Sequence, residues 1–211
     1  MKKFSALMLG AMACAAVLVA SCKKDDDKEP GSNPVSTINA AVVNGGSVDV
    51  DTVKAIVYTN GAWYLFATAP YTGGGFTITL PDNVDPECLS LMFDDGAMTS
   101  LSMSNRNVKV VYSDVRGYKS GSNKGNFYYE KWEGEFGEGT QVASSSLVYA
   151  DGDVVITGTH TETSGAQTNI DVYNVSLKKG WNFMYRARER SDNTRKDTYT
   201  TSDPGAKWYH N

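Results

Sequence analysis

The sequence contains only two histidines, His160 and His210. A Ser-His-Asp site needs a histidine held between a nucleophile and a carboxylate, and the chain has no nucleophile-elbow pattern. His160 lies between two threonines, and we expect it to point from a strand into solvent. The composition therefore argues against acyl-transfer catalysis.

Net charge is also small, because 20 basic residues face 24 acidic ones. A mildly acidic protein has no electrostatic reason to bind nucleic acid. Paired aspartates can suggest calcium, which gathers about 6–8 oxygens, but each pair here adjoins a turn or a strand start and none continues into an EF-hand-like series. We therefore expect no metal and no cofactor at these pairs, which are Asp49/Asp51, Asp94/Asp95 and Asp151/Asp153.

The N-terminal segment has the layout of a secretory signal peptide. Lys2 and Lys3 precede an apolar run over residues 4–20, and small residues then lead to Cys22. A retained transmembrane helix is the alternative, but the run falls short of the about 20 apolar residues that span a bilayer. We predict that residues 1–21 are removed, which leaves 18 basic residues against 24 acidic ones.

Val19-Ala20-Ser21-Cys22 resembles the lipobox of bacterial lipoproteins. The resemblance implies that Cys22 is the lipid attachment site, acylated with chains such as palmitate, and that residues 22–34 form a flexible tether. The charged run Lys23–Glu29 is similar to the acidic export tag of surface lipoproteins in Bacteroides and its relatives. That similarity implies an outer-membrane protein facing the cell exterior, with the periplasmic face as the alternative. Several acyl chains, and no protein helix, would hold the molecule to the membrane.

Cysteine is scarce as well, with three in the chain. In this interpretation Cys14 leaves with the signal peptide and Cys22 carries lipid, so Cys88 stands alone. No intrachain disulfide can then form, even in an oxidising compartment. Because Cys88 has no paired cysteine or adjacent histidine, we predict that it is a buried small hydrophobic residue.

No segment after residue 30 repeats its apolar residues with the period of a helix over three turns. From Val35 onward, almost every segment with a clear pattern repeats them with the period of a strand. Asn60-Gly61 is the strongest short-range hairpin signal, since a type I′ turn needs positive φ at both positions. Asp151-Gly152 and Lys179-Gly180 are predicted to turn two further hairpins, with Gly152 at positive φ.

Many short strands separated by turn signals predict an all-β fold, and we expect an antiparallel β-sandwich. A small β-barrel is the alternative, because counting strands does not determine closure. Residues 35–211 are predicted to form this one domain, with two small β domains divided near residue 105 as the alternative. Residues 117–125 are predicted to be a polar loop, and residues 186–197 are a polar stretch.

Part of the folded region looks like the C-terminal half of small uncharacterised Bacteroides-type lipoproteins. The residues that carry this resemblance are Val148–Gly158 and Leu177–Asn182. It implies a β-rich surface protein and carries no assigned catalytic residues. Asp51-Thr52-Val53 also fits the acceptor pattern for O-glycosylation in those bacteria, and the start of a strand is its alternative interpretation.

Several carboxylates lie close together in the sequence, at Glu130, Glu133, Glu135 and Glu138. In a strand Glu133 and Glu135 would project on one face, and two carboxylates can cleave a glycosidic bond. The competing interpretation is a solvated strand edge, where charge prevents edge-to-edge aggregation. A small glycan-directed hydrolase that uses the Glu133/Glu135 region is therefore the alternative function.

Aromatic residues are the main surplus of this chain. The strand predicted at Phe127, Tyr128, Tyr129 and Trp132 is aromatic on both faces, although one face of a sandwich strand normally meets water. Burial in the core and its rim is one explanation, and a flat platform for a ligand is the other. We therefore predict a cell-envelope lipoprotein that acts as a non-catalytic binding or structural module, contacting a glycan or another envelope protein through these four residues.

Overall fold

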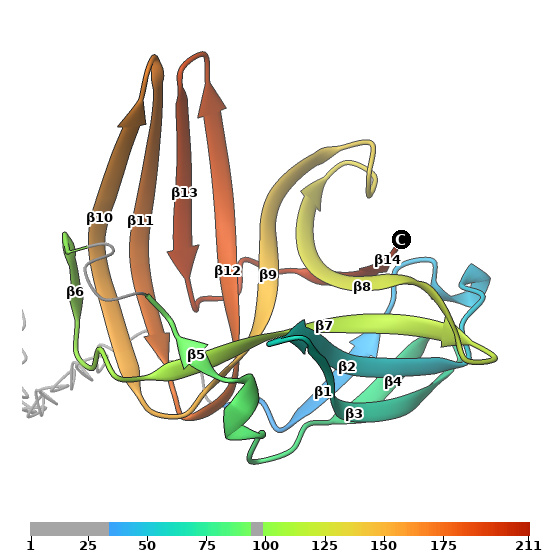
Figure 1. Cartoon of the computed structure of the whole chain (residues 1–211). Coiled ribbons are helices and arrows are strands. Elements are labelled where there is room, and N and C mark those ends of the chain that lie inside the picture. The colour runs from blue at the N-terminus through green and yellow to red at the C-terminus, as the bar shows by residue number, and fades with distance from the viewer. Residues whose placement is uncertain (1–33, 94–98) are drawn as a thin grey trace, which may run out of the picture.

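The computed structural model describes residues 34–93 and 99–211. These residues contain no α-helix, two short 3-10 helices, η1 (Gly45–Ser47) and η2 (Pro86–Cys88), and fourteen strands in one mostly antiparallel sheet (Figure 1). The predicted all-β class is confirmed. No helix in this part of the chain is long and apolar enough to cross a membrane.

The strands are named in chain order. They are β1 (Thr37–Ala41), β2 (Thr52–Thr59), β3 (Ala62–Thr72), β4 (Gly75–Thr79), β5 (Ser90–Leu91), β6 (Leu101–Met103), β7 (Lys109–Lys119), β8 (Ser122–Glu133), β9 (Thr140–Ala150), β10 (Val154–Ser164), β11 (Gln167–Leu177), β12 (Gly180–Ser191), β13 (Thr194–Thr200) and β14 (Lys207–His210).

The sheet is continuous from β1 to β6, in the order β1-β4-β3-β2-β7-β8-β9-β12-β13-β11-β10-β6, and β14 pairs with β8. Its first half bends back on itself, so that β8 and β14 lie above β3 and β4 in Figure 1. An isolated parallel bridge joins Val42, just after β1, to Trp208 of β14. Even so, the sheet does not close into the barrel that was the alternative expectation, and its two facing layers belong to one bent sheet.

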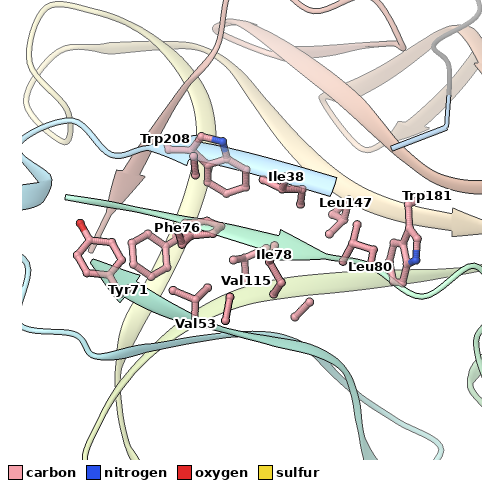
Figure 2. Close-up of a cluster of buried hydrophobic side chains, with 14 of the residues drawn as sticks. Ile38, Val53, Tyr71, Phe76, Ile78, Leu80, Val115, Leu147, Trp181 and Trp208 are labelled. Carbon is pink, nitrogen blue, oxygen red and sulfur yellow. The ribbon is translucent and has the colours of Figure 1, made fainter. Parts of the chain in front are cut away.

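The first hydrophobic core fills the space between these layers. Figure 2 shows Phe76 and Ile78 of β4 next to Val53 of β2, Val115 of β7 and Trp208 of β14, and all five side chains are buried. In β4, Phe76 and Ile78 alternate with exposed residues, as expected for a strand with one face on a core. Burying a large apolar side chain contributes roughly 1.5–3 kcal/mol, so this cluster carries much of the stability of the fold.

Cys88 belongs to the same core. It is buried and free, which confirms the prediction of a small buried hydrophobic residue. Burial also raises the pKa of its thiol, which keeps the sulfur protonated and unreactive at neutral pH.

The second half of the molecule is flatter. The hairpins β10–β11 and β12–β13 stand side by side, joined by parallel pairing of β11 with β13, and they extend beyond the rest of the sheet in Figure 1. A second core, which includes Val148 of β9, Ile156 of β10 and Val175 of β11, packs on one face of this half. The polar stretch 186–197 is mostly strand, in β12 and β13. This part of the sheet is a single layer, so its strands do not need alternating apolar residues to cover a core.

The turn predictions have mixed outcomes. Asn60 and Gly61 have φ of 52° and 78° between paired β2 and β3, so this hairpin is confirmed. The other two are wrong, since β9 pairs with β7, β8 and β12, while β13 lies between β11 and β12. Gly152 is not at positive φ. A local turn signal fixes where the chain bends, but the partner of a buried strand depends on the whole sheet.

The predicted loop 117–125 is a hairpin in the structure. Its strands β7 and β8 reach Lys119 and Ser122, and the turn consists of Ser120 and Gly121, with φ of 48° and 82°. The loop prediction is therefore wrong except at these two residues. Residue 105 lies between β6 and β7, and β7 pairs with both β2 and β9, so strands from either side of this position belong to one sheet.

Candidate functional site

The four residues of the predicted aromatic platform are divided between the core and its edge. Phe127 is 4% exposed and stacks on Tyr71 in the first core. Tyr129 is half-buried, with its ring stacked on Trp208 at 5.1 Å and its hydroxyl donating to Asp203 at 2.7 Å. Burial and this hydrogen bond raise the pKa of Tyr129 to about 12. Both residues therefore have packing partners of their own.

Tyr128 and Trp132 are also half-buried. The Tyr128 hydroxyl accepts a hydrogen bond from Asn126 at 3.1 Å, and the Trp132 indole donates to Glu130 at 2.8 Å. Alternation places Tyr128 and Glu130 on the same face of β8. That face lines a cavity, so Tyr128 is the member of the predicted set that reaches a candidate site.

The two carboxylates of the alternative function lie at the tip of the β8–β9 hairpin. Glu133 and Glu135 are both exposed, on either side of Gly134, which has φ of 93°. Glu130 in contrast is only 7% exposed. Among the residues that the structure describes, no group of three or more His, Cys, Asp or Glu side chains could hold a metal ion.

The most exposed aromatic side chains are on the β2–β3 hairpin. Tyr58, Trp63 and Leu65 are each more than half exposed, at 57%, 54% and 57%. Tyr58 and Trp63 are cross-strand partners with ring centroids 5.1 Å apart. The Arg116 guanidinium lies 4.9 Å from the Trp63 ring centre and is held by Asp114 at 2.7 Å. We call Tyr58, Trp63, Leu65 and Arg116 the aromatic patch.

This patch was not predicted, although the sequence contains a signal for it. In a two-residue hairpin the residues flanking the turn face each other, and side chains two positions apart share a face. Tyr58 and Trp63 flank Asn60-Gly61 at matching positions, and Leu65 follows Trp63 by two. The other face of β3, with Tyr64 and Phe66, packs against the first core. Because both faces of β3 carry an aromatic side chain and only one face packs on the core, an aromatic side chain is exposed whichever face is buried.

A cavity of about 420 Å³ lies on the same side of the sheet, over the segment where residues 144–146 of β9 pair with residues 184–186 of β12. Its size falls in the range of small-molecule sites, about 300–1,000 Å³. A smaller hollow of about 160 Å³ adjoins it where β7 and β8 separate. The cavity is lined by Met92, Phe93, Tyr112, Tyr128, Glu130, Ser144, Ser145, Ser146, Tyr173, Met184, Arg186 and Tyr199.

Two stacked tyrosines form one wall of this cavity. The parallel register of β11 and β13 places Tyr173 opposite Tyr199, and the rings lie 4.6 Å apart at an interplanar angle of 8°. Phe93 meets Tyr173 edge-on at 5.6 Å. Burial raises the pKa of both phenols, so they stay neutral and can both donate and accept hydrogen bonds.

The opposite wall is polar and carries one group of each charge. Arg186 donates to the Ser144 hydroxyl at 3.3 Å, and Glu130 accepts from the Trp132 indole. Within residues 34–93 and 99–211, Trp132 is the only hydrogen-bond partner of the Glu130 carboxylate. In the same part of the chain no hydrogen bond engages the hydroxyls of Tyr112, Tyr173, Tyr199, Ser145 and Ser146.

Beyond the tyrosines, a charged cluster occupies the same face of β11, β12 and β13. Arg188 donates two hydrogen bonds to Asp197, at 2.7 and 2.8 Å, and the Asp197 side chain is 1% exposed. The hydrogen bonds from Arg188 lower the pKa of Asp197. Burial and then the charge of Asp197 raise the pKa of Asp171 next to it. The bidentate pair fixes the register of β12 against β13 beside the cavity.

His160 has two side-chain partners that were not predicted. Its ring nitrogens lie 3.2 Å from Ser100 Oγ and 3.2 Å from a Glu162 carboxylate oxygen, and its side chain is only 19% exposed. The expectation that it points into solvent is therefore wrong. Ser100 and Glu162 are exposed, so water competes for both, and the dry surroundings that strengthen a nucleophile in a hydrolase are missing.

Comparison of the chain with protein-family models, with curated proteins and with solved structures finds no match.

Proposed function

We propose that this protein is a lipid-anchored component of the cell envelope whose β domain binds glycan without catalysis. In this proposal Cys22 carries the lipid, the anchor is in the outer membrane, and the domain faces the cell exterior. The observation that carries the binding role is the aromatic patch.

The patch has the properties of a recognition surface. An exposed aromatic pair with an adjacent leucine is costly to leave in water, and clusters of this kind on a folded protein mark binding sites. Arg116 is already held by Asp114 over Trp63, so little side-chain freedom is lost when a partner binds. A flat indole and phenol offer the C–H faces of sugar rings an apolar surface, and the ion pair at the rim offers hydrogen bonds to hydroxyls.

The arrangement of carboxylates favours binding over hydrolysis. A glycosidase needs two carboxylates held on opposite sides of one bond, about 5–9.5 Å apart. Glu133 and Glu135 are exposed on a hairpin tip, where no hydrogen bond or ion pair within the described residues holds either carboxylate in position.

The lipid anchor is supported by Val19-Ala20-Ser21-Cys22 after the apolar run, all of which lie outside the described residues. The test is to express Cys22→Ala beside the parent and fractionate the cells. We expect the parent in the membrane fraction and the variant released from it. A variant that stays as membrane-associated as the parent would show that lipidation is not the anchor.

The binding role is tested by retention of the purified protein in gels cast with host, dietary and bacterial polysaccharides. Trp63→Ala should lose retention on the polysaccharide that slows the parent. Val155→Ala is the matched control, because Val155 is a 44% exposed hydrophobic residue outside the patch. Equal retention of both variants would refute the role of the patch, and capture of the parent by envelope proteins alone would point to a protein partner.

A further inference from the structure

We propose that the cavity lined by Tyr173, Tyr199, Arg186 and Glu130 is a second binding site, which takes a neutral polyhydroxylated ligand such as a single sugar ring. The aromatic patch is not part of this site. Failure of this inference would leave the proposed role of the patch intact, and failure at the patch would leave the cavity.

The ligand class follows first from the polar groups. A sugar presents hydroxyls that donate and accept at once, so its site needs both donors and acceptors. Arg186 supplies only donors and Glu130 supplies acceptors, while tyrosine and serine hydroxyls do both. These groups converge on one cavity of about 420 Å³.

Glu130 offers hydrogen-bond acceptors to a polar ligand in the cavity. Its side chain is more than nine-tenths buried, yet it accepts one hydrogen bond, from Trp132, within the described part of the chain. A carboxylate can accept about four, and neither Glu130 oxygen is among the buried side-chain atoms that lack a partner in the described part of the chain, so the oxygen that accepts no hydrogen bond is accessible from the cavity. Hydroxyl donors of a ligand in the cavity would bond to that oxygen.

The charge balance excludes strongly ionic ligands. Arg186 alone would attract an anion, but Glu130 lines the same cavity and repels it. Of the other arginines on this face, Arg188 is bound to Asp197 and Arg195 lies 3.6 Å from the same carboxylate, while Arg190 is exposed and lies beyond the cavity. One charge of each sign suits a neutral ligand with many hydroxyls better than a uronate or a sulfate.

The tyrosine wall supplies the apolar part of recognition. Tyr199 is half-buried, and its ring is held by stacking on Tyr173, which is 6% exposed and belongs to the second core. The Tyr199 ring therefore does not have to be ordered when a ligand arrives. Sugar rings carry a C–H face that packs on aromatic surfaces, and a pre-formed wall lowers the entropy cost of binding.

The test is isothermal titration calorimetry of the full-length protein with glucose, galactose, mannose, N-acetylglucosamine and glucuronate as probes. We expect at least one neutral sugar to bind with a millimolar Kd. Arg186→Gln should weaken that binding roughly tenfold, the effect of losing one charged hydrogen bond. Arg190→Gln is the matched control, because Arg190 lies on the same face of β12 beyond the cavity and is exposed, and it should bind like the parent.

Tyr199→Phe keeps the ring and removes only the hydroxyl, so it tests the cavity site even if Arg186→Gln does not fold. It should weaken binding severalfold, while Trp63→Ala in the patch should leave it unchanged. The inference is overturned if no neutral sugar binds at millimolar concentration, if Arg186→Gln and Arg190→Gln bind alike, or if glucuronate is the preferred ligand.

Discussion

At the scale of single residues, Asp197 is a buried charge whose removal should be costly. It is 1% exposed and bound by both donors of the Arg188 fork. Asp197→Asn leaves the arginine without its charged partner, and we expect a loss of about 2–3 kcal/mol in unfolding free energy at pH 7. Urea titration measures this. Glu189→Gln breaks an exposed pair with Lys196 on the same two strands and should cost less than about 0.5 kcal/mol.

The pH dependence of this effect has a definite sign. The pKa of Asp197 is lowered from 3.8 in the folded protein, so the unfolded chain takes up the proton first as the pH falls. The stabilisation is complete above about pH 5 and is lost as the pH drops through 3.8 toward the lower folded value. The difference between parent and Asp197→Asn should therefore shrink below about pH 4. A difference that is constant down to about pH 2 would mean that Asp197 is not charged in the folded state.

Phe127 and Trp63 show how two aromatic residues of one sheet can have different roles. Phe127→Ala should cost about 3–5 kcal/mol, since the ring is buried and the cavity left behind cannot refill. Trp63→Ala should cost less than about 1 kcal/mol, chiefly the contact with Arg116. Melting temperatures of both variants check this. A large loss at Trp63 would make the patch structural and remove the support for recognition there.

At the scale of elements, the β2–β3 turn sets the geometry of the patch. Gly61 has φ of 78°, and a Cβ added there would meet only open space, so Gly61→Ala tests backbone conformation alone. We expect a loss of about 1 kcal/mol, because an L side chain is strained at positive φ. Gly46→Ala is the control, with equally open space and no positive φ. Thermal unfolding followed by circular dichroism compares the two, and equal stability would mean that the turn tolerates a side chain.

The same turn shows what the sequence could predict. Asn60-Gly61 specifies a hairpin locally, because the turn type dictates which strands pair. The hairpins expected at Asp151-Gly152 and Lys179-Gly180 did not form, since the strands beside them have apolar faces that found other partners. Parallel pairing of β11 with β13 brings distant segments together, and no local pattern encodes it.

The candidate sites were less predictable than the fold. Aromatic alternation in residues 127–132 indicated a strand correctly, but which face meets solvent depends on how the sheet bends. Tyr173 and Tyr199 come from strands that pair in parallel, and Arg186 lies in a stretch that had no strand signal. A site assembled across several strands leaves no compact motif in the sequence.

At the scale of the whole molecule, the patch and the cavity share one face of the continuous sheet. Ile56, beside Tyr58, pairs with Asp114 of β7, and Tyr112, two residues from Asp114, lines the cavity. Residues paired across strands or separated by two positions point to the same side. One extended glycan can therefore approach both sites from the same direction, and a chain long enough to cross β2, β7 and β9 would gain from both through effective concentration.

The curled half of the sheet depends on its last strand. β14 pairs with β8, Trp208 is buried in the first core, and the bridge from Trp208 to Val42 links β14 to the end of β1. Beyond β14, Asn211 and Asn126 exchange two backbone hydrogen bonds, at 2.8 and 3.1 Å. The C-terminal residues thus connect β8 to the chain just after β1.

We therefore expect deletion of residues 207–211 to destabilise the whole fold and not only its end. Removing Trp208 alone takes away a buried aromatic worth about 3–5 kcal/mol, out of a total stability of about 5–15 kcal/mol for a domain. The deletion also exposes the edge of β8 that β14 covers, at residues 127–130. Thermal melting followed by far- and near-ultraviolet circular dichroism should show a large fall in melting temperature. Lys207→Ala is the control, since Lys207 is exposed and its loss should change little. A truncated protein as stable as the parent would show that the bent layer holds together without β14.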